Sequence, residues 1–259
     1  MISFYKKITA VCLVASAGFH SVAGGTTTYK WTAEDVTDDA YLSVKLARNG
    51  RLPVHINDIA TDGELVTSLK KIIGNEEGSS ETTCQELIES KVKREDIFYS
   101  VVSSQGEPDY RQSLQTSLEE GFKAFEPKKY PKTADEWQKI WGNKAGANLA
   151  YLLSSNSMKV GCIIGKCTAV QTGSQGGARR QAKTQPEIAV LLCDLQPAAT
   201  KYQAPFDGEY FAGLVARTAK LADMTATDLK APTNDGSAQA AIPSIVFAAL
   251  AAVVTAISA

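Results

Sequence analysis

Histidine is the scarcest chemistry-bearing residue of this sequence, with two copies in 259 residues. His20 lies in a segment at the start of the chain that we expect to be removed, which leaves His55 as the only imidazole. A zinc site with two histidine ligands then cannot form, and any Ser-His-Asp or Cys-His arrangement would have to use His55. The sequence also has no G-x-S-x-G elbow and no P-loop. We therefore interpret His55 as a loop histidine and predict no catalytic residue, no metal and no cofactor.

An excess of basic charge is also missing. The whole chain holds 27 Lys and Arg against 28 Asp and Glu, and its formal net charge is −1 at pH 7. A nucleic-acid-binding domain normally carries a strongly basic face. We therefore expect no nucleic-acid partner.

No charged residue follows Asp235 in the sequence. A stretch of small polar residues, TNDGSAQA, precedes an apolar, Ala-rich tail that contains Pro243. Small residues, a short spacer and an apolar tail are the pattern of a glycosylphosphatidylinositol (GPI) signal. A membrane-spanning helix would normally carry a basic flank, and a core helix would have a polar face. We predict attachment at Asn234, with Gly236 as the second candidate.

The first residues have the order of a secretory signal peptide. Lys6 and Lys7 form a basic head, the apolar run ITAVCLVASAG follows, and Ser21 and Ala23 are small residues at suitable cleavage positions. A cytosolic amphipathic helix would not show this order. The expected organisation is a signal peptide (1–23), one folded domain (24–222), a stalk (223–234) and a GPI signal that is removed (235–259).

Five cysteines are present, and Cys12 falls within the signal peptide. The other four are Cys84, Cys162, Cys167 and Cys193. An even number in an oxidising compartment predicts two disulfides, for which three pairings are possible. Metal ligation is disfavoured because Cys162-x4-Cys167 is not a common zinc spacing.

The hydrophobic pattern predicts a mixture of helices and strands. We expect helices over residues 32–50, 58–74, 82–93, 109–125 and 133–155. We expect strands over residues 96–104, 158–170 and 187–197, and a helix that begins at residue 208 and fades into the stalk. Trp137 and Trp141 lie four residues apart, which places both on one helix face in the core, whereas Trp31 is expected to pack on the outside of the domain.

The segment 171–186 is polar and rich in glycine, so we expect an exposed loop. It contains Arg179 and Arg180. We predict that this pair is a proteolytic processing site, a basic contact patch, or part of a solvated loop without a function.

Several motifs taken together resemble a known group of proteins. GANLAYLLSSNSMKVGCIIGKC and AVLLCDLQPAA are similar to the C-terminal half of the CAP superfamily of cysteine-rich secretory and pathogenesis-related proteins. Within it, TTCQELI, MKVGCIIGKC, VLLCDLQPAA and GEYFAGLVARTAKL look most like the surface antigens of Eimeria. The resemblance covers nearly all of residues 27–230. It implies an α+β fold, a CAP-like three-layer α/β/α sandwich stapled by disulfides.

The resemblance also implies a disulfide pairing, in which Cys162 joins Cys193 and Cys167 joins Cys84. Strand geometry agrees, since residues five apart on a strand point to opposite faces. Metal-binding CAP proteins carry two histidines in a central cleft, and these align with Leu42 and Asn148. Because neither position is a histidine here, we expect that the cleft chemistry is absent.

The resulting functional hypothesis is a non-enzymatic, GPI-anchored parasite surface antigen on the extracellular face of the plasma membrane. Its expected partners are the host-cell surface or host immune factors, and the domain is expected to be monomeric. A CAP-type module that binds lipid or sterol is the second hypothesis, which co-purified lipid would favour. A divergent hydrolase is the third, and it requires an activity that is lost in His55→Ala.

Overall fold

The computed structural model describes residues 26–77, 83–92, 96–125, 128–172 and 186–230. The elements in chain order are β1 (Thr26–Asp35), α1 (Asp38–Asn49), β2 (Ala60–Thr61), α2 (Gly63–Ile73), β3 (Glu76–Glu77), α3 (Cys84–Val92), β4 (Phe98–Val102), α4 (Tyr110–Phe122), α5 (Ala134–Gly142), α6 (Lys144–Leu152), β5 (Lys159–Thr172), β6 (Pro186–Gln196), α7 (Gly208–Ala216) and the 3-10 turns η1 (Leu221–Asp223) and η2 (Ala226–Leu229). This arrangement confirms the α+β class. The CAP-like form of the sandwich stays a prediction.

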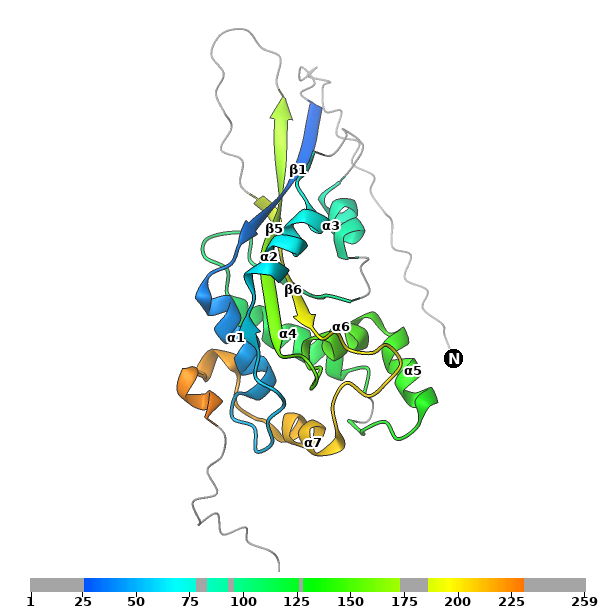
Figure 1. Ribbon diagram of the computed structural model, residues 1–259. Helices are drawn as coiled ribbons and strands as arrows, with labels where there is room; N and C mark the ends of the chain where they lie inside the picture. The colour runs from blue at the N-terminus through cyan, green and yellow to red at the C-terminus, as the bar shows by residue number, and fades with distance from the viewer. Residues whose placement is uncertain (1–25, 78–82, 93–95, 126–127, 173–185, 231–259) are drawn as a thin grey trace, which may run out of the picture.

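The strands form one sheet in the order β3-β1-β5-β6-β4, and the short β2 pairs with β5. All pairs are antiparallel except β2 with β5. Strand β1 pairs with β5 over its whole length, from Thr26 opposite Thr172 to Asp35 opposite Ile163. The far end of this pair, where β1 begins and β5 ends, projects beyond the helices at the top of Figure 1.

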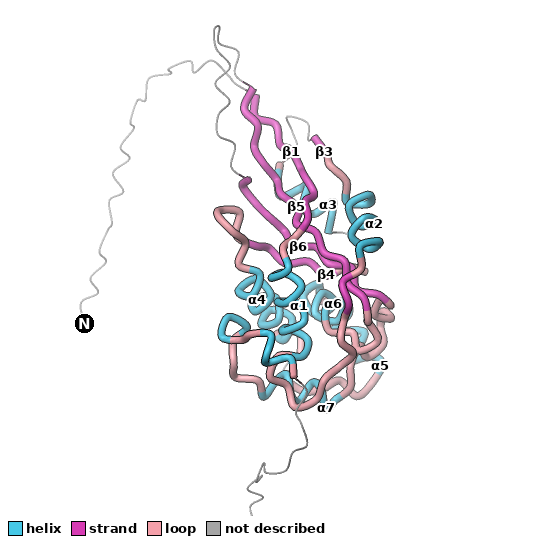
Figure 2. The backbone as a smooth tube through the Cα atoms, turned by 60° about the vertical axis from the view of Figure 1, so that its left-hand side comes forward, coloured by secondary structure: helices cyan, strands magenta, loops and turns pink. Residues whose placement is uncertain are grey.

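Helices cover both faces of the sheet, and each face has its own apolar core. Helices α1, α4, α5, α6 and α7 pack on the face that carries Phe98, Cys162 and Leu191. Helices α2 and α3 pack on the face that carries Ile163, Cys167 and Leu192. Figure 2 shows α2 on one side of the strands and α1 and α4 on the other. All of these core residues fall between Trp31 and Met224, so residues 26–230 contain a complete core.

The largest error of the sequence-based prediction is at the start of the domain. The expected helix over 32–50 is wrong in its first part, because residues 26–35 form strand β1 and α1 begins only at Asp38. The run TTTYKW is β-branched and aromatic, which favours a strand. Thr37 precedes α1, and Asp38 and Asp39 lie in its first turn, which is a common helix start. The pairing of residues 26–35 with β5 places them in the sheet instead of the helix.

The expected helix over 133–155 is divided into α5 and α6. Asn143 ends α5, and its side chain accepts hydrogen bonds from the backbone N–H groups of Ala145 and Gly146 at the start of α6. An asparagine after a glycine is a common helix terminator and a strong N-cap. Trp137 and Trp141 are both buried, so their predicted place in the core is confirmed.

The prediction for Trp31 is wrong. Its side chain is fully buried on β1, in the core under α2 and α3. The ring lies over Gly165 of β5, where an added Cβ would stand 2.0 Å from Trp31 Cζ2. Glycine at residue 165 therefore makes room for the indole, a match between two distant strands that local sequence does not reveal.

Two disulfides join elements of this fold. Cys162 and Cys193 stand opposite each other on β5 and β6 and are bonded, and Cys84 of α3 is bonded to Cys167 of β5. This is the pairing that the family resemblance implied. Cys162 and Cys167 lie in the two different cores, which confirms that they point to opposite faces of the sheet.

Candidate functional site

Asn148 and Leu42, the two positions that the resemblance aligned with histidines, both have structural contacts. Asn148 of α6 is buried, and its side-chain amide pairs with the backbone of Tyr99 on the edge strand β4. Asn148 Oδ1 accepts from Tyr99 N at 2.9 Å, and Asn148 Nδ2 donates to Tyr99 O at 2.8 Å. An edge strand has unpaired backbone groups, and Asn148 occupies two of them. Leu42 of α1 packs against the larger core.

His55 lies half-buried in the loop between α1 and β2. Its Nε2 atom is buried and has no hydrogen-bond partner. The neighbouring Ile56 is held by Asn49, whose side chain donates to Ile56 O and accepts from Ile56 N, both at 3.0 Å. Among the residues that the structure describes, no group of three metal-ligating side chains comes together.

Four of the predicted site residues lie outside the described residues. These are Arg179 and Arg180 in the loop between β5 and β6, and the anchor candidates Asn234 and Gly236. No helix within the described ranges is long and apolar enough to cross a membrane.

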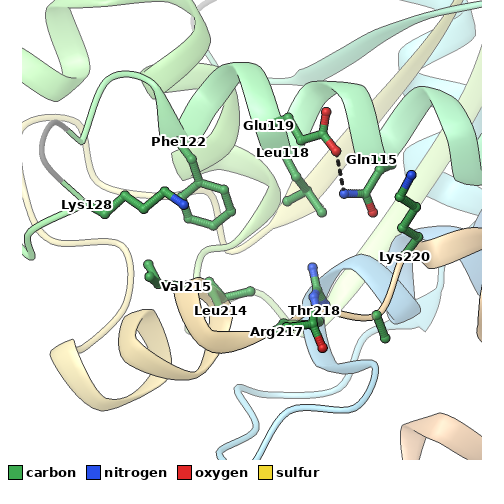
Figure 3. A pocket seen from close by; sticks show the side chains of 11 residues that line it. Gln115, Leu118, Glu119, Phe122, Lys128, Leu214, Val215, Arg217, Thr218 and Lys220 are labelled. Atoms are coloured by element: carbon green, nitrogen blue, oxygen red, sulfur yellow. Dashed lines mark hydrogen bonds between the residues drawn. The ribbon is translucent and has the colours of Figure 1, made fainter.

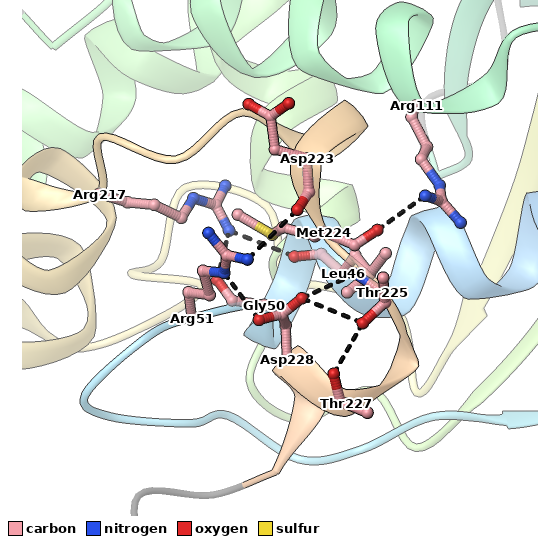
Figure 4. Close-up of polar contacts among 10 residues, drawn as sticks. All are labelled: Leu46, Gly50, Arg51, Arg111, Arg217, Asp223, Met224, Thr225, Thr227 and Asp228. Atoms are coloured by element: carbon pink, nitrogen blue, oxygen red, sulfur yellow. Dashed lines mark hydrogen bonds and ion pairs between the residues drawn. The ribbon is translucent and has the colours of Figure 1, made fainter.

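The end of the described chain packs against the domain. We call residues 221–229 the C-terminal strap. Leu221 and Met224 are fully buried, and the polar contacts are drawn in Figure 4. The predicted stalk over 223–234 therefore needs correction, because its first part belongs to the folded domain. Burial of Leu221 and Met224 removes apolar surface from water, which favours packing of the strap against the domain.

Two arginines hold the C-terminal strap. Arg51 Nε donates to Asp228 Oδ1 at 2.7 Å, and Arg51 Nη2 donates to Asp223 O at 3.2 Å. Arg111 of α4 donates from Nη1 to Met224 O at 2.7 Å. The strap is thus fixed by apolar side chains on its inner side and by cationic donors from α1's end and from α4 (Figure 4).

Two further arginines lie inside the domain near the end of α1. Arg217 Nη1 donates to the carbonyl oxygens of Leu46, Ala47 and Gly50, at 3.2, 3.2 and 3.3 Å. A cation near the last carbonyls of a helix is stabilising because it opposes the negative end of the helix dipole. Burial lowers the pKa of Arg217.

Arg48 is fully buried. Its guanidinium donates to Leu152 O at 2.7 Å, to Asn57 O at 2.9 Å and to Ser157 O at 3.2 Å. Burial lowers the pKa of Arg48 to about 10, so the side chain is still charged at neutral pH. Arg48 thereby ties α1 to the loop that follows it, through Asn57, and to the end of α6 and the connection after it, through Leu152 and Ser157. Helical spacing from Ala40 and Val44 could have placed Arg48 on the buried face, but sequence reasoning missed it.

Low pH is expected to lower the stability of the domain through four carboxylates near its surface. Asp228 beside Arg51, Asp62 beside Lys159, and Glu86 and Glu136 at helix starts all have pKa values below their ordinary 3.8 or 4.5. A carboxyl whose pKa is lower in the folded chain stabilises the fold above its ordinary pKa, and this stability is lost as pH falls through the folded value.

We therefore expect urea unfolding midpoints that are constant between about pH 5 and 8 and fall progressively below about pH 4.5. Asp228→Asn removes one of the four groups and should make this decline less steep. A decline of equal steepness in Asp228→Asn would show that the Arg51–Asp228 pair does not contribute.

Two recessed sites on the described part of the chain are candidates for binding. The first, which we call the α4–α7 cavity, has a volume of about 310 Å³ and lies between α4, α7 and the residues just before the C-terminal strap (Figure 3). Its apolar lining comes from Leu118 and Phe122 of α4 and from Leu214 and Val215 of α7. Its polar lining consists of Gln115, Glu119, Lys128, Arg217, Thr218 and Lys220.

The second site is a broad depression of about 890 Å³ at the start of α2. Two of its charged groups, Asp62 and Lys159, already have partners, because Asp62 caps α2 and pairs with Lys159 Nζ at 2.8 Å. The α4–α7 cavity is therefore the better candidate for a binding site. Sequence reasoning missed it, since its walls come from segments about a hundred residues apart.

Comparison with known proteins gives the family. Residues 56–231 match the sporozoite surface antigen (SAG) protein domain. A search of curated proteins finds no match. Among solved structures, the surface antigen protein SAG19 of Eimeria tenella is similar at 20% sequence identity, covering 71% of this chain and 96% of that chain with a TM-score of 0.43. The match to the SAG domain extends over more than half of the sequence and includes both disulfides, the α4–α7 cavity and the C-terminal strap. The chain therefore belongs to the sporozoite surface antigen family.

Proposed function

We propose that this chain is a non-enzymatic surface antigen that a GPI lipid holds on the parasite plasma membrane, where it contacts host cells or host immune factors. Family membership implies a cell-surface location. The basic-apolar-small order of the first residues and the small residues before the apolar tail support secretion and lipid attachment. Two disulfides support an oxidising compartment.

The observation that carries this proposal is the position of the C-terminal end of the domain. The C-terminal strap lies at the bottom of Figure 1, whereas the far end of the β1/β5 pair lies at the top. An anchor attached a few residues after Lys230 would keep the strap near the membrane. The far end of the β1/β5 pair would then face outward, where a host molecule can reach it.

Added glycans can test which end makes the contact, because the chain has no Asn-x-Ser/Thr sequon of its own. Thr26→Asn creates a sequon with Thr28 at the outer end, and Asp223→Asn creates one with Thr225 on the strap. The full chain, displayed on mammalian cells, should bind host cells or soluble host immune proteins. A glycan at residue 26 should block this binding, and a glycan at residue 223 should not.

Removal of the glycan with an endoglycosidase should restore binding by the first variant. Equal binding by both glycosylated forms would contradict the proposed orientation. Absence of any binding by the unmodified chain would contradict the proposed attachment role.

Cleavage after Arg179 or Arg180 has a defined signature in this disulfide arrangement. The N-terminal fragment would hold Cys84, Cys162 and Cys167, so the Cys162–Cys193 bridge alone would join the two fragments. We expect native material to run as one band without reductant and as two bands with it. Arg179→Gln/Arg180→Gln should run as one band in both conditions. One intact band of the native protein under reduction would exclude processing.

A further inference from the structure

The α4–α7 cavity has the dimensions and walls of a small ligand site. Its volume of about 310 Å³ lies at the lower end of the range for ligand pockets. Leu118 and Leu214 are buried and form the floor, with Phe122 and Val215 beside them. In Figure 3 these four apolar side chains lie between Lys128 at one end and Lys220 at the other. A ligand with an apolar chain could lie along this floor.

The charge of the cavity is predominantly positive. Lys128, Arg217 and Lys220 line it, against one carboxylate, Glu119. Glu119 accepts a hydrogen bond from Gln115 Nε2 at 2.9 Å, which keeps it on the α4 side. Within the described part of the chain, no carboxylate forms an ion pair with any of these three cations. The cavity thus offers positive charge that a bound anion could use.

Arg217 places a positive charge at a fixed position in the cavity wall. Its Nη1 atom donates to the three carbonyls at the end of α1, so the guanidinium is held in place before any ligand binds. Its contacts are with neutral groups, and burial lowers its pKa. A partly desolvated cation without an anionic partner attracts a carboxylate or phosphate more strongly than a solvated one.

From this combination we propose that the α4–α7 cavity binds a single-chain amphiphile with an anionic headgroup. The headgroup lies toward Arg217 and Lys220, and the chain lies over Leu118, Phe122 and Val215. This inference is independent of lipid anchoring. Because the cavity is closed on one side by the residues that lead into the C-terminal strap, an occupant also joins the strap to α4. Leu221 N already donates to Gln115 Oε1 at 3.2 Å across this junction.

The test uses a secreted form that ends at Asn234, which retains both cores and both disulfides. Its cooperative thermal unfolding is checked first. Decanoate and decyl phosphate are then titrated below their micelle concentrations by calorimetry, together with decanol, decyltrimethylammonium and acetate. We expect saturable 1:1 binding of at least one of the two anionic amphiphiles, and a rise in Tm with its concentration. The tighter anion identifies a carboxylate or a phosphate headgroup.

The charge and the apolar floor are tested separately. Lys220→Glu should weaken binding about 10-fold or more, since it replaces an attraction by a repulsion at short range. Lys139→Glu, an exposed reversal on α5, is the matched control and should change affinity by less than about 2-fold. Acetate and decyltrimethylammonium should not bind, and decanol should bind more weakly than the anions.

Three results would overturn the proposal. These are the absence of saturable binding by either anion, equal binding of the cationic amphiphile, and an affinity that Lys220→Glu does not change.

Discussion

Replacing Arg48 by alanine is expected to lower the free energy of unfolding by about 3–5 kcal/mol. Arg48 is fully buried and donates to the carbonyls of Leu152, Asn57 and Ser157. Alanine would leave these buried acceptors without a donor and would open a cavity beside α1. Urea unfolding followed by tryptophan fluorescence measures the loss, because all three tryptophans lie in the cores.

Two further variants separate the contributions of hydrogen bonding, packing and charge to this loss of stability. Arg48→Met keeps most of the volume but donates no hydrogen bond, so it should recover only the part of the loss that comes from the cavity. Lys45→Ala, three residues earlier on α1, removes a cation that contacts Asp58 at 3.7 Å, and should cost less than about 1 kcal/mol. A loss below about 1 kcal/mol in Arg48→Ala would show that the α1–β2 loop and the end of α6 do not depend on this side chain.

The two disulfides are expected to contribute unequally. Removing the Cys84–Cys167 bridge with paired alanines should cost about 4–5 kcal/mol, because it closes a loop of 83 residues. Removing the Cys162–Cys193 bridge, with a separation of 31, should cost about 1 kcal/mol less. All four cysteines are buried to a similar extent, so the cavities left by alanine are comparable.

Chemical unfolding of the two double variants under identical conditions gives this order directly. The Cys84–Cys167 bridge also ties α3 to the sheet, where only Cys84, Leu87 and Ile88 of that helix are buried. A larger loss from the Cys162–Cys193 variant would contradict a mainly chain-entropic role and would point to strain or packing instead.

Local patterns in the sequence predicted much of this fold. The β-branched runs around Cys162 and Cys193 are strands, and the amphipathic segments over 58–74 and 109–125 contain α2 and α4. In each of these segments the apolar periodicity of the chain agrees with the burial that the fold imposes. The disulfide pairing came from family resemblance, since spacing alone left three possibilities.

The parts that could not be predicted depend on contacts between distant residues. Residues 32–35 belong to β1 because β5 is available as a partner, and Trp31 is buried because residue 165 is glycine. In the sequence, the C-terminal strap resembles a polar stalk. Only the structure shows that Arg51 and Arg111 bind it to the domain. The α4–α7 cavity has the same origin, because residues 115–128 and 214–220 become neighbours only in the folded chain.

Asn148, the position that the resemblance aligned with a cleft histidine, has a structural role. Its side-chain amide pairs with the backbone of Tyr99 at the edge of the sheet. This position is therefore occupied by a structural side chain, which agrees with the non-enzymatic character that the surface antigen family suggests.

The central claim, an outward-facing domain on a lipid anchor, is tested most directly by release from living cells. The full chain is expressed in a mammalian cell, and intact cells are treated with phosphatidylinositol-specific phospholipase C, followed by nitrous acid for anchors that resist the enzyme. We predict release of the domain into the medium, whereas a form that ends at Asn234 should enter the medium without treatment. A full chain that stays inside the cell, or that remains on the surface after both treatments, would contradict the account.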